Sequence, residues 1–201
     1  MLLSLPPRGF ACFALQAACP VDLSSEQAVQ LQAWLPPGCA PSPGAWEEVY
    51  RATKHGFGAA AFHARCDGQT RLLLLVRASG WLFGGFTAMG FRPPPEGNGW
   101  YVDPEAFLFS LTNPQGCPEK LEPRRPEPGR KGNNLCYDVA ASANFGHGFP
   151  ADLNIGDDPD TSYTDLGRAY NPPRSSSPYT HPMSCGYKNI WRPNEIVAWA
   201  V

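Results

Sequence analysis

The residues best suited to chemistry are two histidines and a cysteine. His63 and Cys66 are three positions apart, so on a helix they would share a face, as a thiolate with its base or as two metal ligands. His147 lies between glycines in the stretch FGHGF, where the backbone can approach a ligand and an imidazole can act as an acid or base. A buried thiol beside a bonded histidine, and a tight turn, explain the same residues. The residue pattern favours these structural roles, so the three are kept as secondary catalytic candidates.

Acidic residues provide two further candidate sites for binding or catalysis. Residues 157–160 (DDPD) form an acidic turn that lacks the alternating ligands and the glycine of a calcium loop. The four histidines are too dispersed for the ligand spacing of a zinc site. The sequence also has no phosphate-binding loop, no dinucleotide-binding fingerprint and no nucleophile elbow. We therefore expect neither a metal nor a cofactor. Glu195 leads into an apolar terminal strand, where it could pair with an arginine such as Arg192 or mark a polar cleft.

Helical patterns are confined to the first third of the chain. Ser24 and Gln27 have the form of a capping box and predict a helix that ends before Pro36. Residues 42–50 predict a second short helix with its large apolar residues on one side. Residues 58–66 predict a third helix, rich in small residues, that can lie close against a neighbour.

After residue 70 the pattern changes to strands. Residues 71–77 and 81–87 predict a hairpin, in which Gly84 and Gly85 mark a bulge or a close approach of backbone. Residues 119–134 are charged and rich in proline, so we expect a mobile surface loop there. Further strands are expected at 106–111, 135–139, 152–155 and 194–201. In the last of these, Val197 and Trp199 are expected to face one way, and Ile196 and Ala198 the other. Many strands with few helices predict an α+β fold, a two-layer antiparallel β-sandwich flanked by short helices.

Composition and charge exclude several classes of protein. The 201 residues include 23 prolines and 20 glycines but only 17% charged residues, which is typical of a turn-rich domain and not of a helical bundle or a disordered tail. A net charge of −2 is unlike the basic footprint of a nucleic-acid-binding protein. The uncharged runs are too short for a transmembrane segment. Seven scattered cysteines favour reduced thiols, so we expect a cytoplasmic protein.

Several stretches, taken together and in order, resemble the TLDc domain in its protist-type single-domain form. Residues 50–57 (YRATKHGF) are similar to the family's YRASRDGF opening, and residues 61–68 (AFHARCDG) to its AFHxxCDG step. Residues 80–87 (GWLFGGFT) resemble its GxxFGGYT strand, and residues 106–114 match its AFLFSLTNP strand. Residues 145–155 resemble FGGGxDLxI with two residues inserted, and the stretch MSCGY with Glu195-Ile196 resembles the closing segment. As a set these motifs are specific.

The resemblance implies a domain layout and a set of binding positions. Residues 1–22 would be an N-terminal extension and residues 23–201 a TLDc-like domain, with the match strongest over 46–201 and a flexible insert at 119–134. The family's closing Glu-Ile-Glu-Val is replaced by EIVA, so Val197 stands where a second glutamate is usual, and the insert is longer than expected. The expected binding residues are Gly84, Gly85, His147, Asp152 and Glu195.

The resemblance also implies a function. We expect a non-catalytic interaction module linked to oxidative-stress protection, with a protein partner that in animal relatives is the vacuolar proton-pumping ATPase (V-ATPase). A cryptic hydrolase or a thiol- or peroxide-handling enzyme, using Cys66 with His63 or His147 with a carboxylate, stays open as an alternative. The six tryptophans and glycine-rich turns leave a carbohydrate-binding β-sandwich as a second alternative, although most of these tryptophans are at core-like positions.

Overall fold

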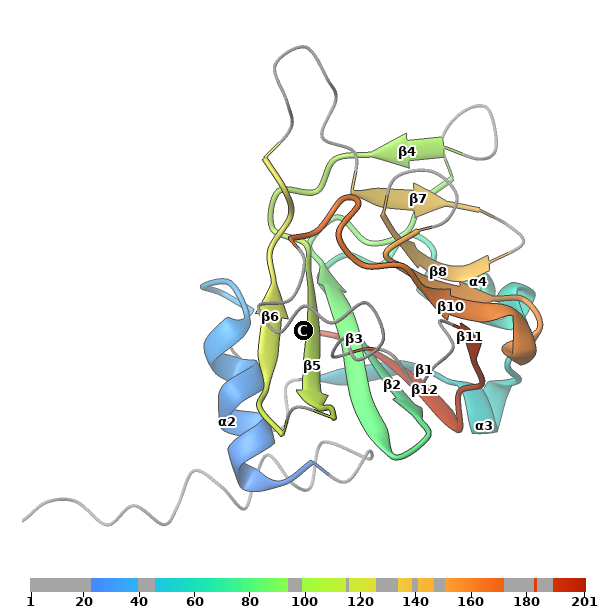
Figure 1. Ribbon diagram of the computed structural model, residues 1–201. Coiled ribbons are helices and arrows are strands. Elements are labelled where there is room, and N and C mark those ends of the chain that lie inside the picture. Colours follow the sequence, from blue (N-terminus) through green and yellow to red (C-terminus); the bar gives the residue numbers. More distant parts are fainter. Residues whose placement is uncertain are drawn as a thin grey trace, which may run out of the picture.

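The described part of the chain is a sandwich of two antiparallel β-sheets with a few short helices, as the sequence predicts (Figure 1). The structure is a computed structural model, and it describes residues 23–39, 46–93, 99–114, 116–125, 134–138, 141–146, 151–171, 183 and 190–201. Residues 1–22, expected to be an extension, lie outside this set. None of the described helices is both long and apolar enough to cross a membrane.

The central strands of the first sheet are buried on both faces. Its six strands follow the order β1-β12-β2-β3-β5-β6. Their bounds are Glu47–Arg51 for β1, Leu72–Ala78 for β2, Trp81–Thr87 for β3, Phe107–Thr112 for β5, Glu119–Leu121 for β6 and Glu195–Ala200 for β12. Ile196 and Ala198 of β12 join the core between the sheets, whereas Val197 and Trp199 join a separate apolar cluster on the outer face. This alternation follows the pattern read from the sequence.

The second sheet packs one face against the first and turns the other face outward. Its strands follow the order β11-β10-β9-β8-β7-β4. Their bounds are Gly99–Tyr101 for β4, Leu135–Tyr137 for β7, Ala141–Phe145 for β8, Leu153–Gly156 for β9, Ser162–Thr164 for β10 and Ile190–Trp191 for β11. Inward side chains such as Leu135, Phe145 and Ile155 are fully buried in the core shared with the first sheet.

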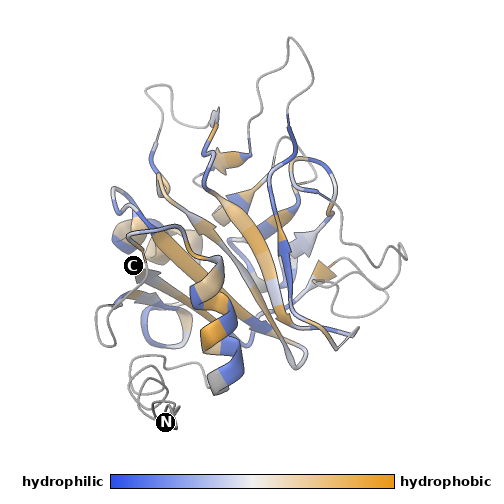
Figure 2. Ribbon diagram, turned by 90° about the vertical axis from the view of Figure 1, so that its left-hand side faces the viewer, coloured by the Kyte–Doolittle hydropathy of each residue, from blue (hydrophilic) through white to orange (hydrophobic). Residues whose placement is uncertain are grey.

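Helix α2 (Ser25–Trp34) covers the outer face of the first sheet. The predicted capping box is present: Gln27 N donates to Ser24 Oγ at 3.2 Å, and Ser24 N donates to the Gln27 side chain at 2.9 Å. Leu31 is fully buried against the sheet, and the ring of Trp34 lies 6.3 Å from that of Phe109. Figure 2 looks onto this helix, with strongly hydrophobic strands behind it.

Two shorter helices lie at one end of the sandwich, where α3 contacts β12 and β1, and α4 contacts β1 and β8 (Figure 1). Helix α3 (Ala52–His55) follows β1 directly, and α4 (Ala59–Cys66) is the predicted small-residue helix. The carboxylate of Asp157 accepts a hydrogen bond from Ala59 N at 2.7 Å, so one residue of the acidic turn caps α4.

Two local predictions are wrong, and pairing at a sheet edge explains both. Residues 47–51, expected to continue a helix over 42–50, form β1 because they pair with β12; residues 40–45 lie outside the described part. Residues 119–121, expected to belong to a mobile loop, form β6 and pair with β5. An edge strand tolerates charged residues, and Lys120 Nζ lies 4.3 Å from the centre of the Phe107 ring. Residues 126–133 of the insert are outside the described part.

Candidate functional site

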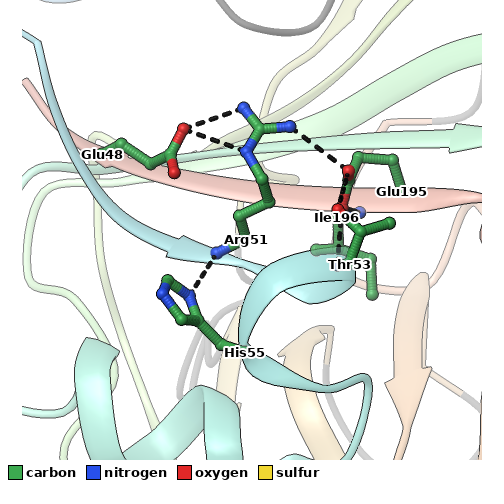
Figure 3. A network of polar contacts seen from close by, with 6 residues as sticks. All are labelled: Glu48, Arg51, Thr53, His55, Glu195 and Ile196. Atoms are coloured by element: carbon green, nitrogen blue, oxygen red, sulfur yellow. Dashed lines mark hydrogen bonds and ion pairs between the residues drawn. The ribbon is translucent and has the colours of Figure 1, made fainter.

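Two of the family-like motifs meet at one corner of the first sheet (Figure 3). Arg51 ends β1, Thr53 lies in α3 and Glu195 begins β12, so residues 144 positions apart in the sequence are in contact. Arg51 Nη1 donates to the Glu195 carboxylate at 3.2 Å, and the Thr53 hydroxyl donates to it at 2.6 Å. Glu48 accepts two bonds from the same guanidinium, at 2.8 and 3.1 Å. Glu195 therefore pairs with Arg51 and not with Arg192, the partner suggested from the sequence.

The polar groups at this corner find their hydrogen-bond partners within the protein. Both carboxylate oxygens of Glu195 accept hydrogen bonds, including one from the backbone N–H of Thr53 at 3.1 Å. Burial lowers the pKa of Arg51, but the hydrogen bonds and charges of Glu48 and Glu195 outweigh this effect and raise that pKa above its ordinary value. The side chains of Arg51 and Glu195 are each 16% exposed. The network therefore ties the opening motif to the last strand.

The histidine and cysteine of α4 do not form a reactive pair. His63 Nε2 lies 2.9 Å from the carbonyl of Ala141 and 3.1 Å from that of Asp138, and Nδ1 lies 2.8 Å from the Asp67 carboxylate. Both ring nitrogens are therefore engaged with acceptor groups of the fold, and neither is left to act as a base toward a thiol. Cys66 is fully buried, and burial raises the pKa of its thiol. The pair serves to fasten α4 to the second sheet.

Asp152 holds the loop that follows β10. Its carboxylate accepts backbone hydrogen bonds from Gly167 at 2.8 Å, Arg168 at 3.0 Å and Ala169 at 2.8 Å. Tyr170 N donates to it at 3.4 Å. Asp152 is fully buried, and burial outweighs these bonds and raises its pKa. The residue therefore acts as a clamp inside the fold.

Gly84 and Gly85 are placed where the core leaves no room for a side chain. A Cβ on Gly85 would lie 2.6 Å from the ring of Phe145, across the core, and one on Gly84 would meet the backbone carbonyl of Leu74. The expected close approach of backbone is present, and the neighbour is the protein itself. His147 lies outside the described residues.

The candidate residues that are described therefore do not converge on one cleft. The glycines lie in the middle of the sandwich, Asp152 beside the loop after β10, and Glu195 at the corner near α3. Within the ranges described, no three His, Cys, Asp or Glu side chains are grouped as a metal site.

The outer face of the second sheet carries a row of side chains that the sequence analysis missed. From β4 to β11, one outward residue of each strand lies directly opposite one of the next. The row comprises Trp100, Cys136, Asn144, Asn154, Tyr163 and Ile190. All six line a hollow of 510 Å³, which we call the outer groove. Its volume lies in the range of small-ligand sites, about 300–1,000 Å³.

The outer groove is polar at its centre and apolar at both ends. Trp100 and Ile190, at the two ends, are 53% and 61% exposed. Asn144 is 8% exposed, and its Oδ1 is buried without a hydrogen-bond partner in the described part of the chain. Asp138 and Asp160 also line the groove, whereas no lysine, arginine or histidine is among its described lining residues. These groups suit a ligand that donates hydrogen bonds and is neutral or positively charged.

Comparison with known families identifies the domain. The model of the TLDc domain matches residues 23–185 of the 201-residue chain. The chain belongs to the TLDc family. The matched range of this TLDc domain includes the covering helix α2 as well as the hairpin and most of the second sheet. TLDc domains are linked in general to oxidative-stress resistance, and the assignment suggests a protein-interaction module. The comparison with curated proteins gives no match.

Proposed function

We propose that this TLDc domain is a non-catalytic interaction module in the protection of cells against oxidative stress, and that its partners are subunits of the V-ATPase. One observation carries the proposal: the motif groups that could react and that the structure describes are engaged within the fold or buried, whereas the outer groove presents polar groups to a ligand. The His63 ring, the Cys66 thiol and the Glu195 carboxylate are the groups concerned. General-base or nucleophilic chemistry needs a free lone pair, and these contacts occupy or shield it.

The partner is tested by affinity capture. The full chain is immobilised and exposed to lysate from its own source cells, with and without hydrogen peroxide, and bound proteins are quantified by mass spectrometry. We expect V-ATPase subunits to be enriched over a column that carries heat-denatured chain. Absence of every pump subunit under both conditions, with a folded chain on the column, removes this partner.

The non-catalytic part of the proposal needs a separate test. In cells that lack their own TLDc protein, we expect the chain to improve survival in peroxide, and Cys66→Ala to protect equally well because the thiol is a buried packing group. Loss of protection by a Cys66→Ala variant that unfolds at the wild-type denaturant concentration would support the thiol enzyme instead.

A further inference from the structure

The length of the outer groove favours an elongated ligand. Its row of outward residues crosses all six strands of the second sheet, each residue opposite the next. Neighbouring strands are about 4.8 Å apart, so the row is about 24 Å long, which matches about seven residues of extended chain. A compact ligand would contact only part of this row.

The centre of the groove offers an unpaired acceptor to a hydrogen-bond donor. Asn144 Oδ1 is buried and has no partner within the described ranges, and Asn154, directly opposite on β9, is also only 8% exposed. Buried polar atoms are nearly always hydrogen-bonded, because an unpaired acceptor is unfavourable. A ligand N–H or O–H at this point would satisfy the amide oxygen. A peptide backbone carries such N–H donors at regular intervals.

The apolar ends of the groove and its acidic lining residues indicate which side chains a bound ligand would carry. Trp100 and Ile190 offer exposed apolar surface at opposite ends of the row. Asp138 and Asp160 add negative charge; Arg192 contacts Asp160 at 3.5 Å, but both side chains are largely exposed, and such pairs are weak. The lining therefore favours lysine or arginine in the ligand and disfavours phosphate or nucleic acid.

From these three features we infer that the outer groove binds a short extended segment of a partner protein, about seven residues long, in which lysine or arginine stands beside apolar residues. The inference rests on the proposed function, since it gives the interaction module its contact surface. Backbone N–H groups of the segment meet Asn144, apolar side chains meet Trp100 and Ile190, and the basic side chain meets the aspartates.

A neutral oligosaccharide fits the same groove less well. It could stack on Trp100, but it would gain little from the two carboxylates, and Ile190 offers no ring face for stacking. The observations therefore favour the peptide, and sugar binding is an outcome of the test.

The test begins with selection of phage-displayed random heptapeptides on the immobilised full chain. The selected peptides are synthesised and titrated calorimetrically into the wild type, Trp100→Ala, Asn144→Leu and the control Val29→Ala. Val29 is 59% exposed on α2, so the control removes a comparable exposed apolar residue from the opposite layer. A neutral-glycan array is probed with the same proteins.

We expect the selected peptides to combine basic and apolar residues and to bind more weakly at high salt. Trp100→Ala and Asn144→Leu should weaken binding by about tenfold or more, and Val29→Ala should leave it unchanged. Asn144→Leu should also unfold no earlier than the wild type, because it removes an unpaired acceptor. A merely structural asparagine would instead destabilise the fold when replaced.

Several results would overturn the inference. These are selection of no peptide, selection of acidic peptides, binding unaffected by Trp100→Ala, or glycan binding that Trp100→Ala abolishes. Affinity capture separates this failure from failure of the proposed function. If Trp100→Ala and Asn144→Leu capture V-ATPase subunits as the wild type does, the groove is not the contact surface and the proposed function stands. If the wild type captures none, the proposed function fails whatever the peptides do.

Discussion

The outer faces of the two sheets differ in what covers them. The first sheet turns Phe109, Val197 and Trp199 outward, where they are buried in one apolar cluster with Leu31 of α2 and with Trp46. The second sheet turns outward the row that lines the outer groove, with amides at its centre and exposed apolar residues at its ends. One face is therefore closed by the chain itself, and the other presents a surface that suits an external ligand.

The buried polar residues of the two sheets differ in the same direction. In the strands of the first sheet the buried polar residues are Thr87 and Ser110. Those in the strands of the second sheet are Ser142, Asn144, Asn154, Ser162 and Thr164. The first layer is thus held mainly by apolar burial, and the second relies more on polar contacts such as the Asp152 clamp.

The largest effect is expected from Trp199→Ala on the covered face. Trp199 is fully buried, with its ring 6.0 Å from that of Trp46, so its removal should lower the free energy of unfolding by about 3–5 kcal/mol. The matched change Trp100→Ala, at a half-exposed site, should lower it by less than about 1 kcal/mol. Urea denaturation measures both. Equal losses would show that the two outer faces do not differ.

The cover itself is tested by a pair of substitutions in α2. Leu31→Ala should lower the free energy of unfolding by about 2–3 kcal/mol, because the side chain is fully buried against the sheet. Val29→Ala, on the exposed side, should change it by less than about 0.5 kcal/mol, since alanine favours the helix. A Leu31→Ala variant as stable as Val29→Ala would mean that α2 does not close this face.

Asp152→Asn tests the polar clamp of the second layer. An amide nitrogen would face backbone donors, so we expect a loss of about 1–3 kcal/mol in urea denaturation at neutral pH. Because the folded-state pKa of Asp152 is raised, its contribution is fully present below the unfolded pKa of about 4 and is lost as pH rises through the folded value. The penalty of the substitution should therefore be larger near pH 4 than near pH 7. A penalty that grows with pH would contradict this reading of the clamp.

The smallest effect is expected at the groove centre. Asn144→Leu should leave the free energy of unfolding unchanged or raise it by up to about 1 kcal/mol, because it replaces an unpaired buried acceptor with an apolar side chain of similar size. Thermal and urea denaturation measure the change. A clear loss would show that Asn144 is a structural residue and that the groove centre resembles the rest of the layer.

Much of the fold could be predicted because its signals are local. The capping box and the 72–78 and 81–87 hairpin formed as expected, and Ser79 and Gly80 both have positive φ, as a two-residue type I′ turn requires. The apolar alternation of the last strand also gave the correct faces. The strand at 47–51 was missed because its apolar spacing also fits a helix, and only pairing with the distant last strand decides between them.

The site was harder to predict, because its geometry is non-local. The partner of Glu195 comes from 144 positions earlier in the chain, and nothing near Glu195 indicates Arg51. The groove is built from strands of two to five residues, each contributing one outward side chain. A pattern such as Leu135-Cys136-Tyr137 is too short to show a period of two. The row exists only once six strands are in register.

The most direct test of the account is photo-crosslinking in cells. A photoreactive benzophenone amino acid is placed in the full chain at Trp100 on the open face, or at Val29 on the covered side, and cells are irradiated after peroxide treatment. We expect adducts with V-ATPase subunits from position 100 and none from position 29. Pump adducts from position 29 alone, or no pump adduct from either position, would contradict it.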